Sequence, residues 1–130
     1  MTNNIAPLIL AVDDDRDFLE IIEAKLVSQG YQVITAANGN DAIAKARAAN
    51  PAIILMDVEM PEKDGITAAS ELAVDEKTKS IPTIFVTNLS KETASSLAQR
   101  VALHIDSAHY FRKDGDYVFL MKEVQSLIAA

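Results

Sequence analysis

Acidic residues stand directly after two short apolar stretches of this sequence. Asp13, Asp14 and Asp15 follow the apolar residues 8–12, and Asp57 follows the apolar residues 53–56. Short apolar runs of this kind are typical of strands buried on both faces of a parallel sheet. A carboxylate at the end of such a strand places charge at the mouth of a core, where charge is costly unless it is compensated. A divalent ion with oxygen ligands would compensate it, and Mg²⁺ is typically held by one or two carboxylates with phosphate oxygens and water.

The elements that would position these residues follow from an alternation along the chain. Five short apolar runs, at residues 8–12, 31–36, 52–56, 82–87 and 110–111, alternate with five segments of helical spacing. This alternation predicts an α/β domain with a parallel sheet covered by helices on both faces. The apolar residues that mark the five helices are Phe18, Leu19, Ile22 and Leu26; Ala42, Ile43 and Ala46; Ala69 and Leu72; Ala94, Leu97, Ala98, Val101 and Ile105; and Leu120, Val124, Leu127 and Ile128.

Several residues predict where these elements begin and end. Gly30 stands where the left-handed residue after a helix belongs, and Ser90 is placed to cap the N-terminus of the fourth helix. We expect a turn at residues 38–40 and a third helix over residues 66–75. Gly65 would permit a tight or left-handed turn just before that helix.

The residues that follow the other strands strengthen the case for a site. In open parallel sheets, ligands bind beyond the carboxyl ends of the strands. Thr87 ends the fourth run and Lys113 follows the fifth, whereas nothing ionic follows the second. If the first and third strands are neighbours about 4.8 Å apart, three carboxylates share one crevice. Each like-charged pair at about 5 Å costs roughly 3 kcal/mol at an effective dielectric near 20, so a cation is needed there.

Each of these residues also has a purely structural interpretation. Asp13, Asp14 and Asp15 could cap a helix, because acids favour a helix N-terminus. Asp57 alone could be a turn residue, Thr87 could reflect strand propensity, and Lys113 could be a solvated charge. Their joint placement at one edge of one predicted sheet favours the site.

Composition limits the class of protein. The chain has 130 residues, of which 49% are hydrophobic, so we expect one domain with its own core. Nineteen acidic residues against 12 basic ones give a net charge of −7, which argues against binding nucleic acid or membranes by charge. There is no cysteine, hence no disulfide and no thiolate metal site. No signal peptide or membrane span is recognisable, and a cytosolic protein is expected.

Four motifs in order resemble the receiver domain of two-component response regulators. ILAVDDD is similar to the first strand of that family with its acidic pair, and ILMDVEMPEKDG is similar to its phosphoacceptor strand and loop. TIFVTN resembles the fourth strand with its hydroxyl residue, and YFRK resembles the fifth strand with its aromatic residue and lysine. The resemblance spans essentially all 130 residues. It implies a flavodoxin-like, doubly wound (βα)5 fold with strand order 2-1-3-4-5, and a single receiver domain over residues 1–130 without an output domain.

The resemblance also implies chemistry. Asp57 would be the nucleophile that takes a phosphoryl group from a phosphohistidine. Mg²⁺, for which Mn²⁺ can substitute, would be bound directly by Asp14, Asp57 and the backbone carbonyl of Glu59, and through water by Asp13. Lys113 would pair with Asp57 at rest and with the phosphoryl group afterwards.

A switch would follow phosphorylation. The Thr87 hydroxyl would donate to a phosphoryl oxygen and draw the following loop inward, and Tyr110 would turn inward with it. Glu59 and Leu89 stand at positions that tune phosphoryl lifetime in this family. Because a leucine cannot position water, we predict slow self-dephosphorylation.

The sequence departs from the family in two places. Asp114 follows Lys113 where the family usually has proline, often after a cis bond. Because a cis bond before a non-proline residue costs about 2.5–4 kcal/mol, we predict a trans Lys113–Asp114 bond and a different turn at Asp114–Gly115. The stretch between Thr87 and Lys113 is also a few residues longer than usual, so the fourth helix or the loop 104–109 should be extended. His104 and His109 have no motif context.

The leading functional interpretation is a phosphorylation-dependent signalling switch that is not a turnover enzyme. Its partners would be a sensor histidine kinase or a histidine phosphotransfer protein and an unidentified downstream protein, with no direct contact to nucleic acid or membrane. It would be a monomer, with phosphorylation-linked dimerisation through the fourth helix, fifth strand and fifth helix. One alternative is a degenerate receiver that acts only as a binding scaffold. A Mg²⁺-dependent phosphohydrolase is disfavoured, because Glu59 stands where such enzymes usually carry a second aspartate and no substrate-binding cap is inserted. A nucleotide-binding protein is disfavoured too, because no glycine-rich loop follows a strand.

Overall fold

The structure is a computed structural model that describes residues 5–104 and 109–129. Five strands form one parallel sheet in the order β2-β1-β3-β4-β5. They are β1 Leu8–Val12, β2 Gln32–Ala36, β3 Ile53–Met56, β4 Thr83–Thr87 and β5 Tyr110–Arg112. The helices are α1 Arg16–Ser28, α2 Gly39–Ala49, α3 Gly65–Val74, α4 Lys91–Gln99 and α5 Tyr117–Ala129. The predicted fold class and strand order are therefore confirmed.

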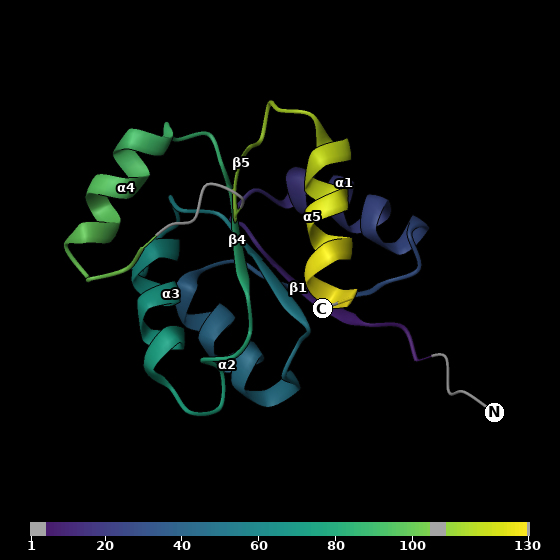
Figure 1. Ribbon diagram of the computed structural model, residues 1–130, viewed down its shortest axis with the longest axis horizontal. Helices are drawn as coiled ribbons and strands as arrows, with labels where there is room; N and C mark the ends of the chain where they lie inside the picture. The colour runs from purple at the N-terminus through teal and green to yellow at the C-terminus, as the bar shows by residue number, and fades with distance from the viewer. Residues whose placement is uncertain (1–4, 105–108, 130) are drawn as a thin grey trace.

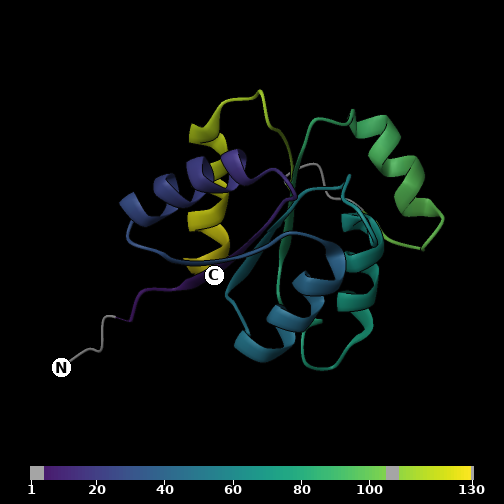
Figure 2. The same ribbon diagram turned by 180° about the vertical axis from the view of Figure 1, so that it is seen from behind.

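Helices cover both faces of the sheet, as Figures 1 and 2 show from opposite sides. Alternate residues of each central strand point to opposite faces, which divides the core into two clusters. Ile9 and Ala11 of β1 face α1 and α5, whereas Leu10 and Val12 face α2, α3 and α4. Since β3 has an apolar neighbourhood on both faces, all four of its residues are buried. This explains why its sequence reads as a continuous apolar run.

The helix starts follow the expected local chemistry. Asp15 caps α1 by accepting hydrogen bonds from the backbone N–H groups of Asp17 and Phe18, at 3.0 and 3.2 Å. Ser90 caps α4 as predicted, through the N–H of Thr93. Asn38 caps α2, so the turn expected at residues 38–40 is instead the first turn of a helix. Side-chain oxygens at these positions satisfy N–H groups that the helix itself leaves free.

Two glycines serve different purposes. Gly30 has a φ of +94°, so the predicted left-handed residue after α1 is confirmed. Gly65 was expected to permit a tight or left-handed turn, and its positive φ is not found, because it is the first residue of α3. A Cβ atom at Gly65 would lie 1.8 Å from the backbone oxygen of Asp57. Gly65 is therefore required for close approach of α3 to the end of β3.

The fourth helix is shorter than the apolar pattern suggested. Val101 was expected to lie on α4, but the helix ends at Gln99. Ala102 has a φ of +55°, and the N–H of Leu103 turns back to the carbonyl of Ala98 at 2.9 Å, which closes the helix. Val101 therefore lies in the turn beyond α4, and whether this helix is longer than is usual in the family stays a prediction. Ile105 and most of the loop 104–109 lie outside the described residues, so the prediction of a longer loop stays a prediction.

The end of β5 shows how the chain continues without the usual proline. Among the described residues there is no cis peptide bond, so the Lys113–Asp114 bond is trans as predicted. A turn follows β5, in which the N–H of Gly115 donates to the carbonyl of Arg112 at 3.0 Å. The Arg112 guanidinium contacts the carboxylate of Asp114 through Nε and Nη2, at 3.1 and 3.3 Å. Asp114 is thus engaged with Arg112 on the surface.

Candidate phosphoacceptor site

The sheet itself positions the predicted site residues. The N–H groups of Asp13 and Asp57 donate to the last carbonyls of the neighbouring strands, Ala36 at 3.0 Å and Val12 at 2.9 Å. The N–H of Lys113 donates in the same way to Thr87 at 3.0 Å. The ladder of the parallel sheet therefore extends one residue past each strand end. These side chains consequently stand on rigid backbone at one edge of the sheet.

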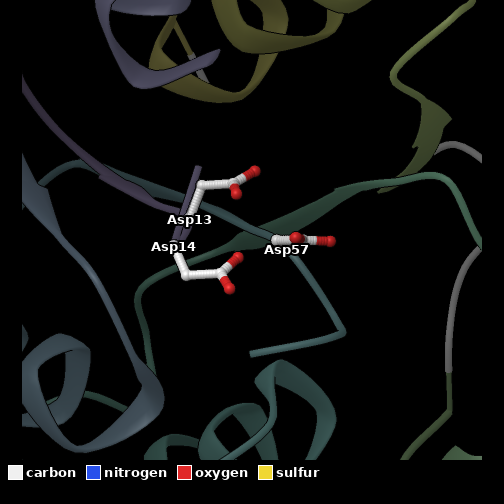
Figure 3. A group of neighbouring side chains, drawn as sticks. All are labelled: Asp13, Asp14 and Asp57. Carbon is white, nitrogen blue, oxygen red and sulfur yellow. The ribbon is translucent and has the colours of Figure 1, made fainter. Parts of the chain in front are cut away.

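Three carboxylates converge at this edge. Asp13, Asp14 and Asp57 each offer an oxygen, and these atoms all lie within 4.8 Å of one another. Figure 3 shows the three side chains gathered at the ends of β1 and β3. Asp13 is 1% exposed and Asp57 is 5% exposed, whereas Asp14 is open to solvent. Two nearly buried acids and one accessible acid thus share one opening.

Lys113 neutralises part of this negative charge. Its Nζ lies 2.7 Å from Oδ2 of Asp13 and 3.2 Å from Oδ2 of Asp57. The other oxygen of Asp57 accepts a hydrogen bond of 2.7 Å from the N–H of Val58. Lys113 was expected to pair with Asp57, and the structure adds a shorter ion pair to Asp13. One ammonium group therefore bridges two carboxylates.

The charges alter the titration of the groups in contact. Burial, together with the neighbouring charge of Asp57, raises the pKa of Asp13 from 3.8 to about 6, although Lys113 and the N–H of Asp15 act in the opposite direction. Burial lowers the pKa of Lys113, but its contacts with Asp13 and Asp57 outweigh burial and raise the pKa overall. In the absence of a metal ion, burial therefore makes ionisation of Asp13 costly.

The donor set fits a hard divalent cation. The three carboxylates offer only oxygen atoms, which Mg²⁺ prefers. Oδ2 of Asp13 is buried and lies 2.7 Å from the Lys113 ammonium, which pairs with two of the three carboxylates, so negative charge is left for a cation to offset. Glu59, whose backbone carbonyl was predicted to be a ligand, lies two residues after Asp57 and is exposed. The residues present therefore suit the ion that the sequence predicted.

Thr87, Leu89 and Tyr110 form a connected path away from the acids. Thr87 is fully buried, and its Oγ1 accepts a hydrogen bond of 3.3 Å from the N–H of Leu89. The carbonyl of Leu89 accepts a hydrogen bond from the hydroxyl of Tyr110. Both Leu89 and Tyr110 are half-buried against the core under α3 and α4. Tyr110 is thus already half-buried in this structure, and its further inward turn on phosphorylation stays a prediction.

Two side chains beside Lys113 were not singled out by sequence reasoning. The Phe18 ring lies beneath its ammonium, 4.7 Å from Nζ to the ring centroid, and the Tyr117 hydroxyl donates to its backbone carbonyl at 2.6 Å. In the sequence, Phe18 was only one more apolar residue of α1. Tyr117 had no motif signal at all. The Phe18 contact joins elements distant in the chain, whereas the Tyr117 contact spans four residues and depends on the turn between β5 and α5.

Comparison with known families settles the relationship. The family model of the response regulator receiver domain matches residues 9–125. The chain belongs to this family. This receiver domain is 35% identical over 121 residues to the protein PilH of Pseudomonas aeruginosa. The matched residues cover 93% of this chain and 97% of PilH. It is 37% identical over 120 residues to the response regulator PleD of Caulobacter vibrioides, covering 92% of this chain but only 25% of PleD.

Solved structures show the same likeness. The receiver domain of the sensor histidine kinase PA1611 from Pseudomonas aeruginosa has a TM-score of 0.85, with 27% identity over 97% of this chain and all of the other. That structure has a magnesium ion coordinated in its active-site cleft. A response regulator from Chloroflexus aurantiacus has a TM-score of 0.83 with 25% identity, covering 97% of this receiver domain and 100% of the other chain. The fold is thus that of known receiver domains.

Among the described residues, no helix is long and apolar enough to cross a membrane.

Proposed function

We propose that this receiver domain is a phosphorylation-dependent switch in which Asp57 accepts the phosphoryl group. The observation that carries the proposal is the convergence of Asp13, Asp14 and Asp57 with Lys113 bridging two of them. Family membership supports a signalling role of this kind. Asp57 is the acid held at the centre of the sheet, between the ends of β1 and β4.

The chemical step is an in-line displacement. A carboxylate oxygen of Asp57 forms a bond to phosphorus while the phosphorus–nitrogen bond of a phosphohistidine breaks. The imidazole nitrogen leaves with the electron pair, and an acyl phosphate results on Asp57. Lys113 is released from Asp57 and pairs with the new phosphoryl oxygens. In this proposal the phosphohistidine is supplied by a sensor histidine kinase or a histidine phosphotransfer protein.

The acidic residues hold Mg²⁺ in this proposal. Asp14, Asp57 and the backbone carbonyl of Glu59 bind it directly, and Asp13 binds it through water. Mn²⁺ substitutes, since it also accepts oxygen ligands. When bound, the ion supplies positive charge beside the phosphoryl oxygens. The cluster of three carboxylates, of which Lys113 pairs with only two, supports this role.

The conformational change that follows phosphorylation involves Thr87, Leu89 and Tyr110. The hydroxyl of Thr87 donates to a phosphoryl oxygen and draws the loop after β4 towards Asp57. Because Leu89 is hydrogen-bonded to both Thr87 and Tyr110, its movement changes the surface beside α4. A downstream protein recognises that surface, and the phosphorylated form can dimerise through α4, β5 and α5. In this proposal the domain is a cytosolic monomer at rest, and it catalyses only its own phosphorylation and dephosphorylation.

Intact-protein mass spectrometry tests the proposal. Wild type and Asp57→Asn are incubated with phosphoramidate, with either Mg²⁺ or EDTA. We expect one phosphoryl adduct in wild type, dependent on Mg²⁺ and absent from Asp57→Asn. Asp75→Asn is the matched control, because Asp75 lies at the end of α3 and pairs with Arg47 on the surface. An unmodified wild type that is folded and binds Mg²⁺ would instead support a degenerate receiver acting as a binding scaffold.

A further inference from the structure

Lys113 is held by more than its two carboxylates. Its N–H donates to Thr87, its carbonyl accepts from the Tyr117 hydroxyl at 2.6 Å, and its ammonium lies over the Phe18 ring at 4.7 Å. These three contacts come from β4, α5 and α1. A long lysine side chain normally retains much rotamer freedom. Here both ends of the residue are restrained from different elements.

The Phe18 ring is itself fixed in place. Its backbone N–H donates to the Asp15 carboxylate in the N-cap of α1, and its side chain packs half-buried against the core under α1 and α5. The ring face therefore lies at the mouth of the acidic site. An ammonium over an aromatic face is attracted by the negative potential of the ring. A leucine would fill similar space without this attraction.

Tyr117 restrains the backbone where the chain has no proline. Asp114 and Gly115 lie between Lys113 and α5, and neither limits φ as proline would. Tyr117 is the first residue of α5, and its hydroxyl reaches back to the carbonyl of Lys113. The hydrogen bond ties the end of β5 to the start of α5 across this turn. It is a local restraint on the residue that carries the ammonium.

We propose that Phe18 and Tyr117 are positioning residues for Lys113, the ring directing its ammonium and the hydroxyl fixing its backbone for contact with the phosphoryl group. The inference rests on the proposed phosphorylation of Asp57 and identifies how this chain orients its lysine. Neither residue touches the phosphoryl group. Each acts only through Lys113.

Phosphorylation rates with phosphoramidate and saturating Mg²⁺ provide the first test. We expect Phe18→Leu to slow the rate by about twofold to fivefold, the range of a cation–π contact. Phe18→Tyr, which retains the ring, should restore a rate near that of wild type. Tyr117→Phe should slow the rate by about fivefold, the worth of one hydrogen bond. Phe119→Leu is the matched control, because Phe119 makes a similar contact with Lys122 at 5.9 Å on an exposed part of α5.

A double-mutant cycle separates positioning from general packing. In a Lys113→Met background, Phe18→Leu and Tyr117→Phe should cause no further loss, because the residue on which they act is gone. An equal fold-loss in both backgrounds would overturn the proposal, since it would show that these side chains matter only for packing. If Phe18→Leu does not fold, Phe18→Met supplies the same comparison with a more flexible apolar side chain.

NMR of the metal-free protein tests the same contact without phosphorylation. Protons above an aromatic face are shifted upfield, so the methylene next to the Lys113 ammonium should move downfield in Phe18→Leu and stay in place in Phe18→Tyr. A Lys113 signal that is identical in wild type and Phe18→Leu would refute the role of the ring. If wild type gives no phosphoryl adduct, the proposed function fails, and this NMR result still decides whether Phe18 orients Lys113.

Discussion

The ammonium of Lys113 lies closer to Asp13 than to Asp57, with Nζ–Oδ2 distances of 2.7 and 3.2 Å. Lys113 therefore neutralises part of the carboxylate charge that a metal ion would neutralise in the acidic site. Since Asp13 is 1% exposed, its charge has almost no solvent to stabilise it. The lysine and a divalent cation should consequently oppose each other at this site.

Replacing Lys113 should strengthen binding of Mg²⁺. In Lys113→Met we expect the dissociation constant for Mg²⁺ to fall by about tenfold or more, because repulsion between like charges about 5 Å apart amounts to a few kcal/mol at an effective dielectric near 20. Isothermal titration calorimetry measures this directly. Lys79→Met is the control, since Lys79 pairs with Glu76 on the surface. An unchanged affinity in Lys113→Met would show that the lysine does not oppose the ion.

Asp13 should make the metal-free protein less stable as the pH rises. Its folded-state pKa is raised from 3.8 to about 6, chiefly by burial, so the folded state binds more protons than the unfolded state between these values. The stability that Asp13 contributes is therefore present below about pH 4 and is lost as the pH rises through 6. In Asp13→Asn we expect the free energy of unfolding at pH 7.5 to rise by about 1–2 kcal/mol and its slope between pH 4 and 6 to flatten.

Urea denaturation in EDTA across this pH range measures the effect. Asp41→Asn is a suitable comparison, because Asp41 forms a surface ion pair with Lys45. A wild type and an Asp13→Asn variant with parallel pH profiles would contradict the prediction. Added Mg²⁺ should stabilise wild type more than Asp13→Asn, because one carboxylate of the site has been removed.

Gly65→Ala should damage both stability and the site. The Cβ of the new alanine would lie 1.8 Å from the backbone oxygen of Asp57 and 2.8 Å from its carbonyl carbon. Backbone atoms cannot move aside cheaply. We expect a loss of about 2–4 kcal/mol in the free energy of unfolding, with slower phosphorylation because Asp57 is displaced. Gly30→Ala is the comparison variant, because Gly30 has a φ of +94° but no atom lies within 4 Å of the position of a Cβ. It should lower the free energy of unfolding by about 1–2 kcal/mol through backbone strain and leave phosphorylation unchanged. Equal phosphorylation rates for the two variants would argue against this role of Gly65.

Leu89 should prolong the phosphorylated state. Its side chain is half-buried against the core beside the site and offers no group that could orient an attacking water. We expect a half-life of minutes or longer for the isolated phosphorylated domain and a several-fold shorter one for Leu89→Gln. Loss of the phosphoryl adduct, followed by mass spectrometry after removal of the donor, measures both. A half-life of seconds in wild type would contradict the prediction. Leu97→Gln is the control variant, because it places an amide side chain against the same core cluster from α4.

The sequence alone determined the fold class and the location of the site. Short apolar runs, four of which end at or near Asp13, Asp57, Thr87 or Lys113, sufficed because a parallel sheet places all its carboxyl ends at one edge. The strand order came from resemblance to the receiver family and is confirmed by the structure. The boundaries were less accessible: α4 ends at Gln99 because Ala102 adopts a left-handed conformation, which no local residue preference announced.

The tertiary structure alone decided how the site is held together. Lys113 lies closer to Asp13 than to Asp57, Tyr110 is hydrogen-bonded to the carbonyl of Leu89, and Gly65 is needed for close approach instead of a left-handed turn. Phe18 and Tyr117 reach Lys113 from α1 and α5; in the sequence, Phe18 was an ordinary apolar residue of a helix and Tyr117 carried no signal. The physical reason is that periodicity reports which face of an element is buried, whereas distances between side chains on different elements depend on how those elements pack.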